Sequence, residues 1–187
     1  LAILLDRLLP DRANWALTVL ATDINPEALE LAHRALYREW SFRDTPQWIR
    51  DRYFLQCAPE AFELAPAIRE MVTFAPLNLA EGGYPTLVTN TGAMDMILCR
   101  NVLMYFTPEA QRATVERVHR ALLRGGWLAV SPAEASAELL RPLTPVNLPG
   151  AILYRKEAPK IAPQAPVILT AQPPAPAPWK SVVEVPV

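Results

Sequence analysis

The sequence predicts an α/β fold, with helices on both faces of a mostly parallel sheet. Continuous apolar runs alternate with helical patterns along the chain, and polar residues directly follow three of these runs. The 187 residues are 51% hydrophobic and 20% charged, which is typical of one globular domain with a core. Because the net charge is −1 and the sequence contains no basic block, nothing indicates a nucleic-acid partner.

We expect a soluble, cytoplasmic protein without membrane insertion. No apolar run approaches the roughly 18 residues of a membrane span, and no basic and apolar leader opens the chain. The two cysteines, Cys57 and Cys99, form no C-x-x-C pair, and His33 and His119 have no companion at ligand spacing. We therefore expect neither a disulfide nor a metal site, and we interpret Cys99 as a small core residue.

The first third of the chain is predicted to form a helix, a strand and a second helix. LAILLDRLL has a helical pattern, and ALTVLATD (16–23) is a continuous apolar run typical of a parallel strand buried on both faces. Asn25 and Pro26 then provide a helix cap and a first-turn proline. The apolar stripe of this second helix is predicted to consist of Leu29, Ala32 and Leu36.

The middle of the chain is predicted to hold a helix, a small antiparallel sheet and a strand. The helix begins at Thr45-Pro46 and runs through QWIRDRYF. Short, partly alternating runs between residues 57 and 75 predict a small antiparallel excursion. MVTFAPLNLA is interpreted as another strand, which breaks at Pro76 and leads into a loop rich in Gly, Pro, Thr and Asn at 81–92.

The last predicted elements are a strand, a helix and two further strands. MDMILCR is a buried strand, and Thr107-Pro108 starts a helix that the glycine pair at 125–126 is predicted to end. WLAVS (127–131) and AILYRKE (151–157) are interpreted as strands. The apolar stripe of the helix is predicted to consist of Val115, Val118 and Leu122.

Polar residues follow three predicted strands at their carboxyl ends, where ligands bind in open α/β sheets. These residues are Asp23, Asn78 and the pair Arg100 and Asn101. Each has a structural alternative: Asp23 as a turn former, Asn78 as a partner for loop backbone, and Arg100 as a cap for strand carbonyls. Together they suit an adenosine-bearing ligand, because an acid can accept both ribose hydroxyls and an amide can pair with an adenine edge.

A glycine-rich cofactor loop is missing from this arrangement. All six glycines follow Asp23, and none forms a G-x-G pattern. The helix that such a loop would introduce is LAILLDRLL itself, so the loop is expected to lie just before Leu1.

Four motifs occur in the order ATDINPEALELAHRALY, RDRYF, VTFAPLNL and ILCRNVLMYFTPEAQ, the last followed by GGWLAVSPAE. In these motifs the sequence resembles the CheR family of S-adenosylmethionine-dependent glutamate methyltransferases of chemotaxis receptors. The resemblance implies that residues 1–157 are a partial catalytic domain with a Rossmann-like methyltransferase sheet, truncated before its glycine-rich loop and inactive alone. It also implies S-adenosyl-L-methionine as cofactor and S-adenosyl-L-homocysteine as product.

The resemblance also implies which residues form the site. The implied cofactor contacts are Asp23 at the ribose, Asn78 and Leu79 on the adenine side, and Arg100 with Asn101. Tyr105 and Arg100 are implied at the site of methyl transfer. The substrate would be a glutamate, which with a pKa of about 4.3 is already ionised at pH 7 and needs no general base.

The implied partners are methyl-accepting chemotaxis-type receptors. The small antiparallel excursion lacks the glycine-bearing loop of family members that dock a receptor's C-terminal pentapeptide, so such tethering is not expected. Residues 158–187 contain eight of the 20 prolines and no glycine, which predicts a disordered linker. WSFRDTPQWIRDRYF resembles the branch of the family that carries tetratricopeptide repeats beyond such a linker.

Two other functions remain open at this point. The first is a catalytically degenerate methyltransferase fold that serves as a binding or scaffold module in a sensory pathway. The second is a nicotinamide-binding Rossmann protein, against which the CRNVLMYF motif argues. A glycine-rich loop ending in an acid before Leu1 would favour the enzyme over the scaffold module.

Overall fold

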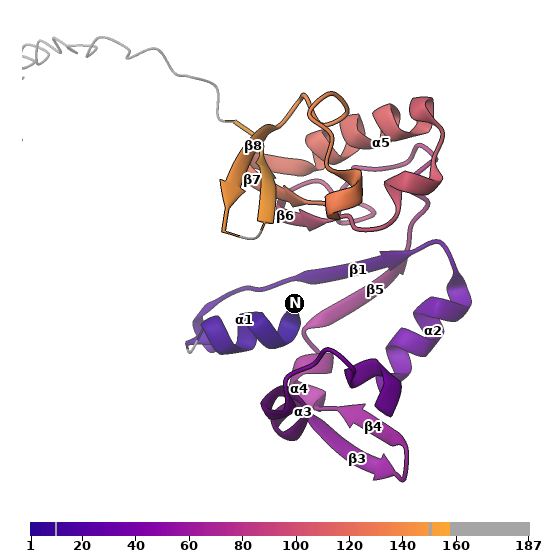
Figure 1. Cartoon of the computed structure of the whole chain (residues 1–187), viewed down its shortest axis with the longest axis vertical. Coiled ribbons are helices and arrows are strands. Elements are labelled where there is room, and N and C mark those ends of the chain that lie inside the picture. The colour runs from indigo at the N-terminus through magenta and orange to yellow at the C-terminus, as the bar shows by residue number, and fades with distance from the viewer. Residues whose placement is uncertain (10, 150, 158–187) are drawn as a thin grey trace, which may run out of the picture.

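The computed structural model describes residues 1–9, 11–149 and 151–157. The predicted linker at 158–187 lies outside the described residues. Figure 1 shows the described chain as two halves, one above the other, joined by the segment between strands β5 (Val72–Pro76) and β6 (Met94–Leu98). The fold is mixed α/β, as predicted, but its strands form three separate sheets.

The N-terminal half is built on the parallel pair β1 (Val19–Asp23) and β5 (Val72–Pro76). Helix α2 (Pro26–Arg34) packs against both strands and begins as predicted, because the Asn25 side chain accepts the backbone N–H of Glu27 at 2.9 Å. The helix ends at a left-handed residue, Ala35, with φ of 53°.

Of the three residues predicted to form the apolar stripe of α2, one lies beyond the end of the helix. Leu36 is not on the helix but opens strand β2 (Leu36–Arg38). The left-handed residue before it turns the chain out of the helix, so that Leu36 is exposed at the edge of a sheet.

A three-stranded antiparallel sheet lies at the far end of this half, in the order β2, β4 (Ala61–Leu64) and β3 (Phe54–Ala58). Helix α3 (Gln47–Tyr53) leads into β3 and confirms the helix predicted there. The antiparallel excursion thus exists, but it uses residues between 36 and 64 rather than 57 to 75. Its predicted end was wrong because β5 pairs in parallel with β1 instead.

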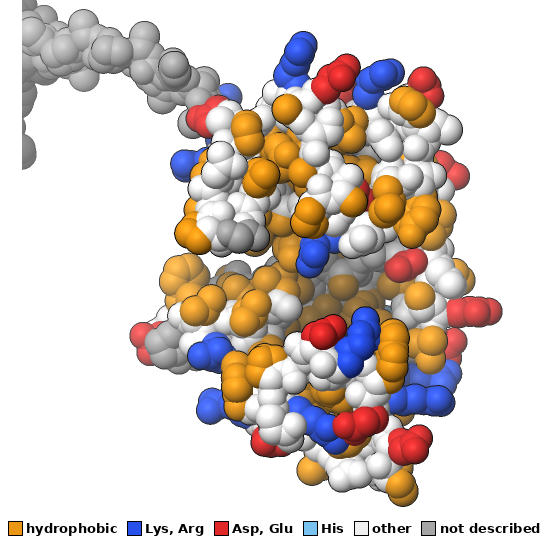
Figure 2. Space-filling model, in the orientation of Figure 1, with side chains coloured by type: hydrophobic (Ala, Val, Ile, Leu, Met, Phe, Trp, Pro, Cys, Tyr) orange, Lys and Arg blue, Asp and Glu red, His pale blue; other side chains and the backbone are white. Residues whose placement is uncertain are grey.

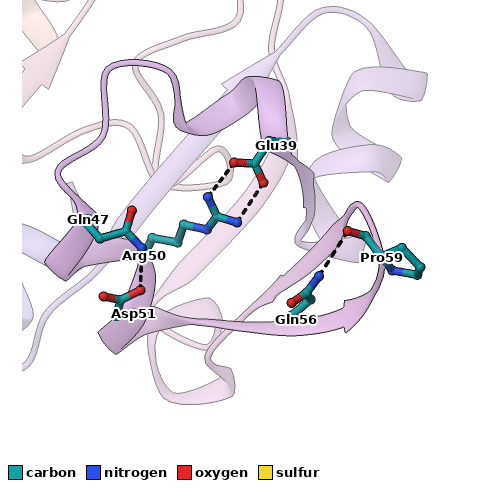
Figure 3. A network of polar contacts seen from close by, with 6 residues as sticks. All are labelled: Glu39, Gln47, Arg50, Asp51, Gln56 and Pro59. Atoms are coloured by element: carbon teal, nitrogen blue, oxygen red, sulfur yellow. Dashed lines mark hydrogen bonds and ion pairs between the residues drawn. The ribbon is translucent and has the colours of Figure 1, made fainter.

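Arg50 of α3 links the turn after β2 to this sheet by contacts with both. Figure 3 shows its guanidinium donating to both carboxylate oxygens of Glu39, at 2.6 and 2.7 Å. The same guanidinium lies 4.3 Å from the ring centre of Phe62 and 5.3 Å from that of Phe42, both buried. The cation therefore covers two aromatic rings while its charge is paired.

Two further contacts in Figure 3 involve amide side chains. Gln47 donates to Asp51 at 2.8 Å within α3, and Gln56 donates to the carbonyl of Pro59 at 3.0 Å across the turn between β3 and β4. Both contacts are exposed, so each adds little to stability.

The C-terminal half holds a four-stranded sheet in the order β6 (Met94–Leu98), β7 (Leu122–Ala129), β9 (Ala151–Arg155) and β8 (Thr144–Leu148). Strands β6 and β7 are parallel, whereas β9 is antiparallel to both of its neighbours. The prediction of mostly parallel order therefore holds only for the two pairs β1–β5 and β6–β7.

Helix α5 (Pro108–Ala121) packs against β7 and begins as predicted, with the Thr107 hydroxyl accepting the N–H of Ala110 at 3.3 Å. Its residues Val115 and Val118 are buried. The main core of the molecule lies beneath it. It consists of Cys99, Leu103, Val115, Val118, Leu122, Leu128, Val130, Leu140, Leu143 and Tyr154.

The glycine pair at 125–126 does not end α5, contrary to the prediction. The helix ends at Ala121, and β7 runs through both glycines. Gly125 has φ of 81°, and a Cβ on Gly126 would lie 3.1 Å from the carbonyl oxygens of Asp95 and Met94 in β6. The pair therefore serves the close approach of β7 to β6, where the strand register shifts.

The two parallel pairs are not joined in one sheet. Among the described strands, β1 pairs only with β5, and β6 pairs only with β7. Figure 2 shows a hollow between the two halves, with hydrophobic side chains along it. The prediction that β1 is buried on both faces is therefore wrong, since Val19 and Leu20 are only partly buried. The prediction that β6 is a buried strand is wrong as well, since Met96 and Leu98 are 43% and 49% exposed.

Candidate functional site

A pocket of about 300 Å³ lies at the carboxyl ends of β1, β5 and β6. Five of the six predicted site residues line it, so three segments that are far apart in the sequence meet there. The sixth, Arg100, is exposed and does not line the pocket. The lining consists of Thr22, Asp23, Ile24, Leu77, Asn78, Leu79, Asn101, Val102, Tyr105 and Phe106.

Asp23 contributes an acid to the pocket from the end of β1. One carboxylate oxygen accepts the backbone N–H of Asn25 at 2.8 Å, and its own carbonyl accepts the N–H of Leu77 at 3.0 Å. The residue is exposed, and its second carboxylate oxygen accepts no hydrogen bond from the described residues. Asp23 thus forms the turn before α2 and still presents a free acceptor.

Asn78 and Leu79 form the wall that follows β5. The Asn78 side-chain oxygen accepts the N–H of Ala80 at 3.0 Å, which leaves the amide NH₂ as a donor. The carbonyl of Leu79 is held more firmly, because Tyr84, Thr114 and Arg117 all donate to it, at 3.1, 3.0 and 3.1 Å.

Two of these three donors come from α5, which belongs to the other half of the molecule. Thr114 is fully buried, and Arg117 also reaches the carbonyl of Ala80 at 3.4 Å. Burial raises the pKa of Tyr84, although the neighbouring Arg117 opposes this. The phenol is therefore protonated at pH 7 and can donate to Leu79.

The loop after β6 forms the third wall. Asn101 has a left-handed backbone, with φ of 60°, and the chain then makes a short 3₁₀ turn, Leu103–Tyr105. Tyr105 lines the pocket with 78% of its side chain exposed. Asn101 therefore brings an amide, and Tyr105 a hydroxyl, to the same pocket as Asp23.

Glu134, which sequence reasoning missed, holds this loop from behind. Its carboxylate accepts the backbone N–H groups of Asn101 and Val102, both at 2.7 Å, and that of Leu103 at 2.8 Å. Burial alone raises the pKa of this carboxyl, but hydrogen bonds from Ser131 and from the Asn101 and Val102 backbone lower the pKa to about 2.

The sequence contains one local sign of Glu134, in the segment SPAE. Ser131 and Glu134 form a capping box around the 3₁₀ turn Pro132–Glu134. The S-x-x-E spacing could have predicted that turn. It could not have predicted the contact with Asn101, which lies more than thirty residues earlier and meets Glu134 only because β6 and β7 are neighbours.

A second hollow, of about 260 Å³, lies before the amino ends of β1 and β5. It contains none of the predicted site residues. Ligands in open α/β sheets bind at the carboxyl ends of the strands, and this hollow lies at the opposite, amino ends. Its lining consists of Arg12, Trp15, Leu17, Ala67, Glu70 and Met71.

Cys99 is buried, as predicted, and burial raises the pKa of its thiol to about 11, so it is not a nucleophile at pH 7. In the described part of the chain, both cysteines are free and no three His, Cys, Asp or Glu side chains are grouped to hold a metal ion. No helix among the described residues has the length and apolar character needed to cross a bilayer.

Residues 1–147 match the family "CheR methyltransferase, SAM binding domain". The chain belongs to the CheR methyltransferase family. This membership implies S-adenosylmethionine as the cofactor, and the groups observed in the pocket fit part of that molecule. Asp23 has an acceptor available for a sugar hydroxyl, Asn78 has a donor, and the volume is at the lower end of the range for small-molecule sites.

Several named proteins are similar to this CheR-family chain. It is 33% identical over 142 residues to "Probable biofilm formation methyltransferase WspC" of Pseudomonas aeruginosa, covering 75% of this chain and 33% of WspC. It is 34% identical over 139 residues to chemotaxis protein methyltransferase 1 of the same species, covering 73% and 48%. A chemotaxis protein methyltransferase of Borreliella burgdorferi is 27% identical over 124 residues, covering 66% and 42%.

The chain therefore spans between a third and a half of the length of these relatives. A solved structure, that of the [4+2]-cyclase SpnF, aligns with 75% of this chain and 48% of its own, at 13% identity and a TM-score of 0.41. A similarity that weak carries no argument about the site.

Proposed function

We propose that this chain carries part of the catalytic domain of a protein-glutamate O-methyltransferase. In this proposal it transfers a methyl group from S-adenosylmethionine to glutamate carboxylates of chemotaxis-type receptors in the cytoplasm. The observation that carries the proposal is the meeting of Asp23, Asn78, Asn101 and Tyr105 in one pocket, in a chain of the CheR family.

In this site the cofactor would supply a methyl group bound to a positively charged sulfur. Asp23 would accept hydrogen bonds from the ribose hydroxyls, and Asn78 with Leu79 would lie against the adenine. Asn101 would contact the cofactor from the wall formed by the loop after β6. Because Asp23 and Asn78 keep polar groups available in the pocket, both roles agree with the observed contacts.

The reaction asks for orientation rather than proton transfer. A glutamate is ionised at pH 7, since its pKa is about 4.3, and no general base is needed. In the proposal, Tyr105 orients the substrate carboxylate through its hydroxyl and excludes water with its ring. Arg100, adjacent to Asn101 but outside the pocket lining, would attract the carboxylate by its charge.

We further propose that in a longer protein another parallel strand lies between β1 and β6. Both strands have an unpaired edge among the described strands, and Figure 2 shows the hollow between the two halves. Helix α1 (Ala2–Leu8) precedes β1 as the helix of a β-α-β crossover would. A glycine-rich loop between that strand and α1 would then end beside Asp23.

The proposal is tested with the full-length protein. Binding of S-adenosylhomocysteine is measured by calorimetry, and methyl transfer is measured on receptor fragments with their methylatable glutamates intact or replaced by alanine. The proposal predicts binding, and transfer only to the intact fragments. Binding without transfer to any receptor fragment would support the scaffold alternative, and the absence of both would refute the proposal.

A further inference from the structure

Glu134 is a buried acid that the proposed reaction does not use. Its side chain is 6% exposed, and it does not line the pocket. One oxygen accepts the N–H groups of Val102, Leu103 and, at 3.4 Å, Met104. The other accepts the N–H of Asn101, and also the N–H of Ser131 at 3.1 Å and its hydroxyl.

Successive backbone N–H groups that point to one place form an anion-binding concavity, usually occupied by a phosphate or another free anion. Here the concavity spans residues 101–104, and a carboxylate of the same chain fills it. The anion comes from the turn that follows β7, whereas the N–H groups follow β6. Glu134 thus ties together the carboxyl ends of two neighbouring parallel strands.

We propose that Glu134 is a positioning residue for the pocket: by holding the N–H groups of Asn101 to Met104, it fixes the backbone that presents Asn101, Val102 and Tyr105 to the ligand. Its effect on methyl transfer rests on the proposed function. Its effect on the loop rests only on the contacts described.

Energetic reasons make the loop dependent on this carboxylate. Asn101 has φ of 60°, a left-handed backbone that is less favourable than a right-handed or extended one even for asparagine, which tolerates it better than most residues. The backbone N–H groups of Asn101 and Val102 donate charge-assisted hydrogen bonds to Glu134 at 2.7 Å, and these bonds offset the unfavourable backbone energy. Without the charge, the loop would lose the contacts that favour this conformation over a more extended one.

The carboxylate also sets the direction of the loop's carbonyl groups. The only cis peptide among the described residues is Tyr84-Pro85, so the peptides of the loop are trans. In a trans peptide the N–H and C=O point in opposite directions. The carbonyls of Arg100 and Asn101, whose peptides donate to Glu134, therefore point away from it.

The test compares Glu134→Gln with Glu138→Gln in the full-length protein. Glutamine has nearly the shape of glutamate but removes the charge and places an NH₂ group against N–H donors. Glu138 is exposed and lies four residues later, so its variant controls for the loss of one negative charge. Ser131→Ala is a milder second variant, because it removes only the hydroxyl that donates to Glu134.

Three quantities are measured: hydrogen exchange of the amides 101–104, the dissociation constant of S-adenosylhomocysteine, and kcat with KM for methyl transfer. Glu134→Gln is expected to abolish the protection of these amides and to weaken cofactor binding by about tenfold or more. Ser131→Ala should have a smaller effect in the same direction, and Glu138→Gln should leave all three unchanged.

Thermal melts on the same samples separate positioning from general stability. A Glu134→Gln protein that melts earlier but binds and turns over like wild type when folded would overturn the proposal. So would unchanged exchange at 101–104, or an increase of exchange spread evenly over the core. If Glu134→Gln does not fold, Ser131→Ala decides by the same criteria.

The exchange measurement also distinguishes this proposal from the proposed function. If the wild-type protein neither binds S-adenosylhomocysteine nor transfers methyl groups, the proposed function fails. Loss of protection confined to 101–104 and the pocket lining would then still support a positioning role for Glu134, and unaltered protection would still exclude it.

Discussion

Asp23 and Asn101 line the same pocket although the first ends a strand of one sheet and the second follows a strand of another. Asp23 ends β1 in the N-terminal half, and Asn101 follows β6 in the C-terminal half. Each side of the pocket is fixed by its own contacts, through the turn to Asn25 on one side and through Glu134 on the other. Substitutions on the two sides are therefore expected to act independently on the fold and jointly on ligand binding.

Asp23→Ala in the full-length protein is expected to weaken S-adenosylhomocysteine binding by about 1–3 kcal/mol, the usual loss for hydrogen bonds to a charged group. Calorimetry measures this. Asp23→Asn separates the two roles of the residue, because it keeps an oxygen for the N–H of Asn25 but removes the charge. It should restore stability but not affinity. Unchanged affinity with reduced stability in the alanine variant would leave Asp23 only as a turn former.

Arg100→Met is expected to raise the KM for the receptor substrate and for the cofactor, since both proposed roles of Arg100 are lost with its charge, and to change stability only modestly because the residue is exposed. Steady-state methyl transfer measures the effect. Arg124→Met is the matched control, since Arg124 is an exposed arginine on β7. A loss of stability without a change in KM would show that Arg100 serves the strand end and not the site.

Tyr105→Phe should lower kcat by about tenfold or more, if the hydroxyl makes one good hydrogen bond in the transition state, and should change the cofactor KM less. Because the side chain is largely exposed, the melting temperature should not change. Tyr37→Phe, on the exposed β2 strand, controls for the loss of a hydroxyl elsewhere. Wild-type rates in the Tyr105 variant would remove this residue from the site.

The stability contributed by Glu134 should depend on pH in a defined direction. Its folded pKa of about 2 lies below its ordinary value of 4.5, so the stabilisation is complete above pH 4.5 and is lost as the pH falls towards 2. At pH 7 the wild type should exceed Glu134→Gln by about 3 kcal/mol in free energy of unfolding. Urea unfolding at several pH values tests this, and a difference that does not shrink with acid would contradict it.

Lys156→Met should destabilise the C-terminal half without affecting the pocket. The Lys156 ammonium donates to the carbonyls of His119 and Leu122, at 2.6 and 2.7 Å, and so satisfies the end of α5. Its loss should cost about 1–3 kcal/mol, measured by urea unfolding. Lys156→Arg should recover much of this, while cofactor affinity should be the same in all three proteins.

Signals that act within one turn of the chain were enough to predict several elements. Asn25-Pro26 and Thr107-Pro108 start α2 and α5 as predicted, because capping depends on neighbours only a few residues away. The rule that ligands bind at strand ends also predicted which segments would meet, and three of the four residues that it indicated, Asp23, Asn78 and Asn101, line one pocket. Leu79 and Tyr105, which only the family resemblance implied, line it as well.

Features that depend on distant neighbours were not predictable. The glycine pair at 125–126 resembles a helix end in sequence, yet its role is set by the carbonyls of β6. The burial of β1 and β6 depends on which strands lie beside them. The apolar content of a strand does not reveal which neighbours it will have. The same holds for Glu134, whose partners lie about thirty residues earlier.

The pocket is divided between two halves that share no strand pairing among the described residues, so its affinity depends on their relative orientation, which in the proposed longer protein the strand between β1 and β6 would set. A ligand that contacts Asp23 and Asn101 together favours one arrangement of the halves over others. Consider a protein that binds both halves in that arrangement. By thermodynamic linkage, it raises the affinity of the pocket for the ligand by the same factor by which the ligand raises the affinity for that protein. Such a partner would change the occupancy of the site from a surface that never touches the ligand.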